Sequence, residues 1–333
     1  MKHLPIFIDV KNKPVIVIGG GDVAFRKTQS LLRAEAKVTV LAKSFITELK
    51  ELDSLRLTLI QSEYHVECLR HKWLVIAATD NNEVNQTIHD DAIAERIWVN
   101  VVDSPKLCQF IFPSIVDRSP LVIAISSGGA APVLARLWRE KLESLIPLWT
   151  GKLVSIAASY RELAQQKIDN LQQRRYVWER VFRGKANQLA AQQRWRDVEQ
   201  AIKDEINTEA KTNAPKGVIH YVGIGPNDPE LITLKALQLM QLADTIIYDE
   251  LLSEDILNLC RKDAHYFEFN ETKNKKDFQN TAVTECLISE YKQGKIICRL
   301  TKNAPKQEHL STMELSALKQ NTIDFQIVSG VPA

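Results

Sequence analysis

The sequence predicts an α/β protein whose N-terminal part is built on a parallel sheet. Strand-like apolar runs alternate with helix-like segments over the first hundred residues, which is the pattern of βαβ units. One run, VIVI at 15–18, is followed directly by three glycines and a helix-like segment. A second strand with a glycine turn begins near residue 218, after a polar stretch. We therefore expect two or three domains in this chain of 333 residues.

The first strand is expected at residues 15–18, where four β-branched residues indicate a buried strand. The glycines after it let the backbone turn tightly and approach a ligand closely. Gly19, Gly21 and Ala24 fit the spacing G-x-G-x-x-G/A, in which a helix N-terminus offers unpaired N–H groups to a pyrophosphate. The spacing favours a dinucleotide site, but the same residues would also serve a simple tight turn.

Four further strands are expected at 37–42, 55–60, 73–80 and 97–103. Ligands of parallel sheets bind beyond the carboxyl ends of the strands. That rule places four groups of residues around one crevice. They are Gly19 to Val23, which include Asp22, then Lys43 and Ser44, then Thr79 and Asp80, and finally Asn100 to Asp103. The acidic residue that usually binds the ribose of NAD is missing after the second strand, where Lys43 stands. Lys43 could accept the 2′-phosphate of NADP or simply be solvated, so the residues alone do not favour NAD.

The segment 108–144 changes character, with two strand-like runs, a polar turn and a helix. The helix start is marked by Gly128, Gly129 and Pro132, and Ser126 and Ser127 precede it. These residues have two alternative roles: they bind an anionic group, or they only cap the start of the helix.

Residues 145–210 are helix-like throughout. A basic and aromatic cluster at 172–185 could form a nucleic-acid face, although a solvated amphipathic helix fits the balanced charge better. The polar stretch NTEAKTNAPKG at 207–217 is typical of a linker.

The composition argues against several classes of partner. Lys and Arg number 43 against 41 Asp and Glu, so the net charge of +2 provides no bulk attraction to nucleic acid or membrane. Five cysteines make no C-x-x-C pair, and we expect neither a metal site nor disulfides. No run of 18 apolar residues occurs. We expect a cytoplasmic protein.

The chain resembles the bacterial siroheme synthase family, whose members join a precorrin-2 dehydrogenase and sirohydrochlorin ferrochelatase module to a uroporphyrinogen-III C-methyltransferase module. The matching segments are LPIF, GGGDVAFRK, IAATDNNEVN, NVVDSPKLCQFIFPSIVDRSPL, SSGGAAPVLARLWREKLES and VGIGPNDPELITLKAL. The resemblance implies these domains: an NAD-binding Rossmann-like domain at 1–113, a small α+β dimerisation region at 114–145, a helical domain at 146–210, a linker at 211–217 and a truncated methyltransferase-like domain at 218–333.

The family's chemistry implies that precorrin-2 loses a hydride to NAD⁺ and a proton to a base, giving sirohydrochlorin. Fe²⁺ then enters as a substrate while pyrrole N–H protons leave. The resemblance assigns the base to Asp103, in the motif NVVD. Asp103 is also the best candidate on physical grounds, because it follows a strand beside the cofactor turn, where partial burial would raise its pKa. It could instead cap the turn that follows.

By resemblance, Asp22, Val23, Lys43 and Ser44 bind the cofactor, with Thr79 and Asp80 nearby. The stretch Ser127–Gly129 suits the carboxylates of the tetrapyrrole, and Ser127 matches a serine that is phosphorylated in some members. The resemblance further implies a homodimer with sites shared across the interface.

The C-terminal part departs from the family pattern. Asn270 and Glu271 stand where the family has Gly and its catalytic Lys, and Lys302, Asn303 and Ala304 replace the glycines and aspartate of GGDP. The chain stops at FQIVSGVPA, where the family continues. Pro226 and Asp249 remain as vestiges of the methyltransferase site. We therefore do not expect S-adenosylmethionine as a cofactor, and we expect the methyltransferase activity to be lost.

Two other function classes stay open. The chain could be a non-catalytic carrier or sensor of tetrapyrrole or NAD, although a carrier has no need of a base beside a nicotinamide. A general NAD-dependent oxidoreductase on small substrates is less well supported, because no catalytic His or Tyr-Lys pair stands at a recognisable spacing.

Overall fold

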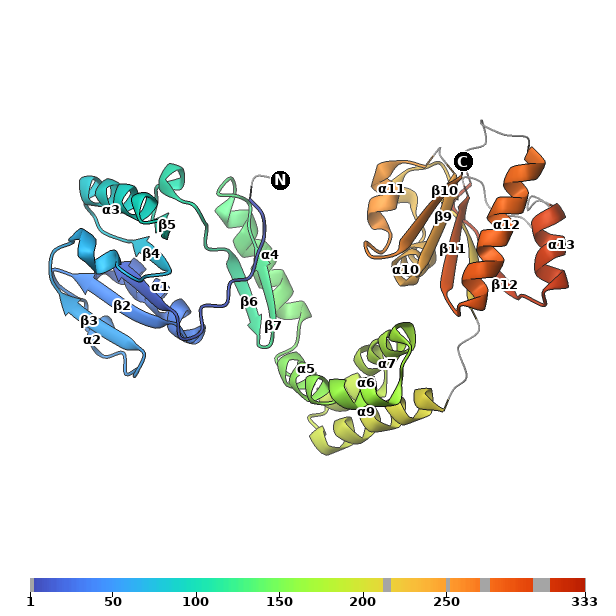
Figure 1. Ribbon diagram of the computed structural model, residues 1–333, viewed down its shortest axis with the longest axis horizontal. Coiled ribbons are helices and arrows are strands. Elements are labelled where there is room, and N and C mark those ends of the chain that lie inside the picture. Colours follow the sequence, from blue (N-terminus) through green and yellow to red (C-terminus); the bar gives the residue numbers. More distant parts are fainter. Residues whose placement is uncertain (1–2, 212–216, 250–251, 270–275, 302–311, 333) are drawn as a thin grey trace. The chain divides into compact units, whose positions relative to one another are not determined.

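A computed structural model describes residues 3–211, 217–249, 252–269, 276–301 and 312–332 (Figure 1). The chain forms two compact units, Met1–Gly151 and Lys152–Ala333. No helix within those described ranges is both long and apolar enough to cross a membrane.

The first unit is built on a five-stranded parallel sheet with the strand order β3-β2-β1-β4-β5. Its strands are β1 Pro14–Ile18, β2 Lys37–Ala42, β3 Leu57–Gln61, β4 Leu74–Ala77 and β5 Trp98–Val101. The expected strands are all present, but β4 and β5 end earlier than expected, at Ala77 and Val101, because the chain turns toward the next helix there. The α/β fold class is confirmed.

Helices cover both faces of this sheet, as α1 Asp22–Arg33 and α3 Asn82–Ala94 show (Figure 1). Alternate residues of β1 enter two separate cores, because side chains of a strand point to opposite faces. Val15 and Val17 pack with Leu31 of α1, whereas Ile16 and Ile18 pack with Ile88 of α3. Burial of both faces explains why the strand is a continuous apolar run.

A hairpin and a long helix complete the first unit: β6 Ser114–Arg118, β7 Leu121–Ile125 and α4 Pro132–Leu145. The buried Arg118 joins them, since its guanidinium donates to the Ile146 carbonyl at 2.9 Å and to the Glu143 carboxylate at 2.5 Å. The expected start of α4 near Pro132 is confirmed.

The helical part of the chain consists of α5 Thr150–Ser159, α6 Arg161–Lys167, α7 Leu171–Arg183, α8 Lys185–Ala191 and α9 Trp195–Ala210. The basic and aromatic cluster lies mainly on α7, where Val177 and Val181 are buried. On the same helix Arg180 forms ion pairs with Glu205 and Glu209 of α9. Part of this basic surface is therefore neutralised by the neighbouring helix.

A second parallel sheet follows, with the order β10-β9-β11-β8-β12. Its strands are β8 Val218–Gly223, β9 Thr245–Asp249, β10 His265–Phe269, β11 Ile296–Thr301 and β12 Phe325–Val328. The helices of this part are α10 Leu234–Leu242, α11 Glu254–Leu259, α12 Lys276–Lys292 and α13 Thr312–Gln320.

Candidate active site

A cavity of about 1030 Å³, here called the nucleotide cavity, lies at the carboxyl ends of β1, β2 and β4. The structure brings together in its lining all eight predicted cofactor-binding residues: Gly19, Gly21, Asp22, Val23, Lys43, Ser44, Thr79 and Asp80. They meet because neighbouring parallel strands end at the same edge of the sheet.

The three glycines of the turn have different roles. Gly19 has φ +134°, and a Cβ there would lie 2.1 Å from the Ala78 carbonyl oxygen. A Cβ at Gly20 would lie 1.9 Å from the Ser44 carbonyl oxygen. A Cβ at Gly21 would meet no protein atom within 4 Å. Close packing of the chain thus requires Gly19 and Gly20, whereas the bare backbone of Gly21 faces open space.

Gly21 is the N-cap residue of α1, and no side chain caps this helix start. The first N–H groups of a helix have no partners within the helix and carry its positive dipole end. A pyrophosphate could approach these groups closely, because Gly21 has no side chain in the way. The turn therefore fits the phosphates of a dinucleotide such as NAD.

Lys43 does not stand alone in this cavity, since its Nζ lies 2.8 Å from Oε1 of Glu63. Both side chains are exposed, and the hydrogen bond from Lys43 lowers the pKa of Glu63. Glu63 was not predicted from the sequence, because the acid that binds the ribose is expected after the second strand, whereas Glu63 follows β3. The strand order places β3 beside β2, and Glu63 thereby joins the cavity lining.

Thr79 helps to shape the turn between β4 and α3. Its hydroxyl donates to Oδ1 of Asn85 at 2.7 Å, and Nδ2 of Asn85 donates to the Thr79 carbonyl. Asn81 caps α3 by accepting hydrogen bonds from the amides of Glu83 and Val84. Thr79 thus holds the loop that forms one wall of the nucleotide cavity.

Asp103 lines a different cavity of about 380 Å³, here called the Asp103 cavity. The predicted residues Ser127, Gly128 and Gly129 line it as well. The residues expected around one crevice therefore line two cavities. The reason is the strand order: β5 lies at the edge of the sheet beyond β4, and the loop after it shares its cavity with the turn between β7 and α4.

The loop that carries Asp103 is held by two residues next to it. Nδ2 of Asn100 donates to the Phe110 carbonyl at 2.8 Å, and the Cys108 thiol donates to the Val101 carbonyl at 3.0 Å. Asp103 itself has φ +59° and is exposed. The expected partial burial of its carboxyl group was wrong, because the turn directs residue 103 toward solvent.

Lys27 of α1 also lines the Asp103 cavity and was missed by the sequence analysis. Its Nζ lies 3.8 Å from the centre of the Phe112 ring. Burial and the nearby Arg26 lower the pKa of Lys27, while Cys108 and Asp103 oppose this shift. The signal was present in the sequence, since Lys27 ends the segment GGGDVAFRK and stands on α1, the helix that follows the glycine turn.

The turn before α4 is built from short-range hydrogen bonds. Oγ of Ser127 accepts from the Ala131 amide at 2.9 Å, and Oγ of Ser126 accepts from the Gly128 amide at 3.0 Å. Gly128 and Gly129 have φ values of +64° and +86°, which other residues adopt only with strain. Ser127 is half-buried and already serves the turn.

In the second sheet, Asp249 ends β9 and its carboxylate accepts a hydrogen bond from Arg299 of β11 at 2.6 Å. Pro226 follows Gly225, which has φ +70°. Arg299 was missed by the sequence analysis as a partner of Asp249. Asn270, Glu271 and the stretch Lys302–Ala304 lie outside the described residues.

The first unit has the features of a dinucleotide-binding α/β protein: a parallel sheet, a glycine turn at its carboxyl edge and a helix that starts there. Four family models match the chain, and their ranges follow one another along it. They are described as "Putative NAD(P)-binding" over 6–114, sirohaem biosynthesis protein central over 118–145, sirohaem synthase dimerisation region over 150–206, and tetrapyrrole (corrin/porphyrin) methylases over 218–333.

Siroheme synthases from two bacteria are similar to the whole chain. The protein of Ruthia magnifica is 40% identical and that of Pseudoalteromonas translucida is 42% identical, each over 334 residues that cover 100% of this chain and 70% of the relative. A solved precorrin-2 dehydrogenase has the same fold, with a TM-score of 0.50 and 22% identity over 61% of this chain and all of that chain. The chain belongs to the siroheme synthase family.

The range predicted from the sequence for the dimerisation region, 114–145, differs from the range of the family model. The family model with that description matches 150–206, the helical part, whereas 118–145 matches the central region.

Proposed function

We propose that the first unit oxidises precorrin-2 to sirohydrochlorin with NAD⁺, and that it then inserts Fe²⁺ to give siroheme. The observation that carries this proposal is the pairing, within one α/β unit, of a nucleotide cavity with a cavity that contains a carboxylate. The match to siroheme synthases over the full chain supports the substrate class.

For the oxidation, we assign binding of the cofactor phosphates to the start of α1 at Gly21. Bound NAD⁺ supplies the acceptor for a hydride from a tetrapyrrole carbon. Asp103 accepts the proton that leaves the ring, so that one hydride and one proton are removed together. Lys27 lines the same cavity and attracts the carboxylates of the tetrapyrrole.

For the metal insertion, Fe²⁺ enters as a substrate and displaces pyrrole N–H protons from sirohydrochlorin. Asp103 accepts these protons and passes them to water, because it is exposed. The same carboxylate thus serves both steps. The turn Ser127–Gly129 contributes to the binding of the tetrapyrrole from the other side of the cavity.

The direct test supplies enzymatically made precorrin-2 and NAD⁺ to the purified full chain without oxygen. We expect NADH and the absorbance of sirohydrochlorin, and then that of siroheme once Fe²⁺ is added. If NADH forms no faster than without the protein, the second function class, a carrier or sensor that binds without reacting, replaces the enzyme.

We propose that the chain prefers NAD⁺ over NADP⁺ because Glu63 lies beside Lys43 in the nucleotide cavity. A carboxylate accepts a hydrogen bond from a ribose hydroxyl but repels a 2′-phosphate. Glu63→Gln should therefore lower the ratio of kcat/KM for NAD⁺ to that for NADP⁺ by about tenfold. Lys43→Gln is the matched control and should move the ratio the other way. An unchanged ratio in both variants would remove the pair from cofactor selection.

Substitutions at two glycines of the turn should have different effects, one on NAD⁺ binding and the other on the free energy of unfolding. Gly21→Val should fold normally but weaken NAD⁺ binding by at least about tenfold, because its side chain fills the space reserved for the pyrophosphate. Gly19→Ala should lower the free energy of unfolding by about 1–3 kcal/mol, because its backbone is strained and its Cβ meets Ala78. Thermal unfolding and calorimetry with NAD⁺ measure the two effects. Strong NAD⁺ binding by a folded Gly21→Val protein would contradict the assigned phosphate site.

We propose that this chain does not methylate uroporphyrinogen III. The support is in the sequence, since Lys302, Asn303 and Ala304 stand at the positions of two glycines and an aspartate in the family pattern. Calorimetry on the full chain should detect no binding of S-adenosylmethionine. A dissociation constant in the micromolar range would contradict this part of the proposal.

We propose a homodimer, with a dimerisation region matched over 150–206. A further apolar face supports association between copies, because α4 exposes Val133, Leu134, Leu137 and Trp138, each at 48% or more. Light scattering on the purified protein should give twice the mass of one chain, and Leu134→Glu should shift it toward one chain if this face is used.

A further inference from the structure

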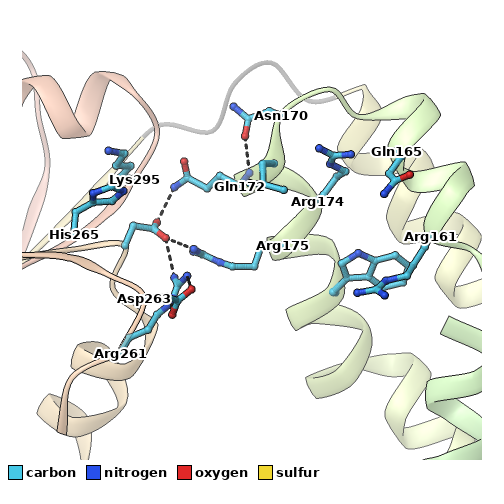
Figure 2. A pocket seen from close by; sticks show the side chains of 13 residues that line it. Arg161, Gln165, Asn170, Gln172, Arg174, Arg175, Arg261, Asp263, His265 and Lys295 are labelled. Atoms are coloured by element: carbon cyan, nitrogen blue, oxygen red, sulfur yellow. Dashed lines mark hydrogen bonds and ion pairs between the residues drawn. The ribbon is translucent and has the colours of Figure 1, made fainter. Parts of the chain in front are cut away.

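The second unit contains a cavity of about 930 Å³ that the proposed chemistry does not use (Figure 2). One side is formed by α6 and α7, and the other by residues at the start of β9, β10 and β11. Its lining carries Arg161, Arg174, Arg175, Arg261 and Lys295 against Asp244 and Asp263. We call it the basic cavity.

The basic cavity lies at the amino edge of the second sheet. Asp244 precedes β9, His265 begins β10, and Lys295 precedes β11, and these strands are parallel. Asp249 ends β9 and therefore stands at the opposite edge. Ligands of such sheets normally bind at the carboxyl edge. The cations of the basic cavity are thus separate from the methyltransferase-like site.

One buried carboxylate, that of Asp244, neutralises part of the positive charge of the basic cavity. Asp244 accepts hydrogen bonds from Gln172 at 2.7 Å and from Tyr176 at 2.8 Å, and it pairs with Arg175 and with Arg261 at 3.0 Å. In Figure 2 dashed lines run to one carboxylate from Gln172 and Arg175 of α7 and from Arg261 on the side of the sheet. Lys295 pairs with Glu290 at 2.8 Å. Three of the five cations therefore have structural partners.

Arg161 and Arg174 are different. Within the described ranges neither guanidinium forms an ion pair with a carboxylate, and Nε of Arg174 is buried without a hydrogen-bond partner. Figure 2 shows both side chains on the helical side of the cavity, away from the contacts of Asp244. The half-buried Trp178 lines the cavity with them. Two free guanidinium groups and an indole thus share one large cavity.

We propose that the basic cavity binds a tetrapyrrole polycarboxylate, with Arg161 and Arg174 holding carboxylates and Trp178 packing against the ring. Guanidinium groups pair with carboxylates through two parallel hydrogen bonds, and an aromatic face packs well on a flat conjugated ring. Cations on separate helices suit a wide ligand with charges around its rim better than a compact anion. The choice of tetrapyrrole among polycarboxylates rests on the proposed function.

The test uses uroporphyrin III, a stable fluorescent porphyrin with carboxylates around its rim, and the full-length protein. Wild type should bind it at two kinds of site, the Asp103 cavity and the basic cavity. The variant with both Arg161→Gln and Arg174→Gln should bind uroporphyrin III at the basic cavity at least about tenfold more weakly, or not at all. Arg183→Gln is the matched control, because Arg183 is an exposed arginine of α7 outside the cavity lining.

Several outcomes decide the proposal. The proposal would be overturned if the double variant bound uroporphyrin III as wild type does. It would also be overturned if Arg183→Gln weakened that binding to the same extent. Displacement of the porphyrin from this site by inorganic phosphate or citrate at equal concentration would show a general anion site and would overturn the tetrapyrrole assignment. Arg161→Gln alone provides a second test if the double variant fails to fold, since Arg161 is exposed.

The dehydrogenase assay separates this proposal from the proposed function. The double variant should remain a dimer by light scattering and should oxidise precorrin-2 at the wild-type rate, because neither arginine lies in the first unit. If wild type itself forms no NADH, the proposed function fails, while loss of porphyrin binding in the double variant would still support the basic cavity as a binding site.

Discussion

Asp103→Asn is expected to lower the rates of precorrin-2 oxidation and of Fe²⁺ insertion by about a hundredfold or more. Asparagine has nearly the shape of aspartate but cannot accept the proton. It also tolerates the positive φ of residue 103, which alanine would adopt only with strain. Anaerobic assays with saturating NAD⁺ would measure both rates, and calorimetry would measure NAD⁺ binding.

NAD⁺ binding should be unchanged in Asp103→Asn, because Asp103 lines a cavity separate from that of the glycine turn. Asp80→Asn is the comparison, since Asp80 is an exposed carboxylate that follows β4, the strand next to β5. If Asp103→Asn keeps the wild-type rates while Asp80→Asn loses them, Asp80 is the base. Loss of only one of the two reactions in Asp103→Asn would show that they use different proton acceptors.

Asp244→Ala is expected to lower the free energy of unfolding of the second unit by about 3–5 kcal/mol. The substitution removes a buried carboxylate on which two arginines, Gln172 and Tyr176 converge. Arg175 and Arg261 would then lose their buried partner, and each would keep only a more exposed one, Glu179 and Asp263 respectively. Urea unfolding followed by tryptophan fluorescence would measure the change, because Trp178 lies nearby in the basic cavity.

Asp263→Asn is the matched control, because Asp263 pairs with the same Arg261 at 2.5 Å but its side chain is 76% exposed. Solvent screens this pair, so its loss should cost no more than about 1 kcal/mol. Its hydrogen bond with Arg261 lowers the pKa of Asp263 to about 2, yet that shift does not translate into much stability at the surface. Equal losses of unfolding free energy in Asp244→Ala and Asp263→Asn would show that burial of the carboxylate does not determine how much it stabilises the fold.

The effect of Asp244 should depend on pH in one direction. Burial by itself would raise the pKa of Asp244, but hydrogen bonds from Arg175, the Ile296 amide and Tyr176 outweigh it and hold the pKa below the ordinary value of 3.8. A carboxyl group with a lowered pKa in the folded state stabilises the fold fully above its unfolded pKa. The stability difference between wild type and Asp244→Ala should therefore be constant near neutral pH and shrink as the pH falls below 3.8.

The cofactor site was predictable from the sequence because it depends on local patterns. The β-branched run of β1 specifies a strand buried on both faces, and the glycines after it specify a tight turn. Parallel strands in βαβ units end at a shared edge. The residues after β1, β2 and β4, from Gly19 to Asp80, could therefore be placed together without knowledge of their contacts.

The remaining site features were decided by the tertiary structure, since each depends on elements far apart in the sequence. The strand order brings Glu63 to Lys43 and moves Asp103 into its own cavity with the turn before α4. Asp244 collects partners from α7 and from both sides of β9 only because the helix packs against the amino edge of the sheet. A local pattern sets the conformation of a segment, but which segments become neighbours is settled by burial of apolar surface and pairing of buried charges over the whole unit.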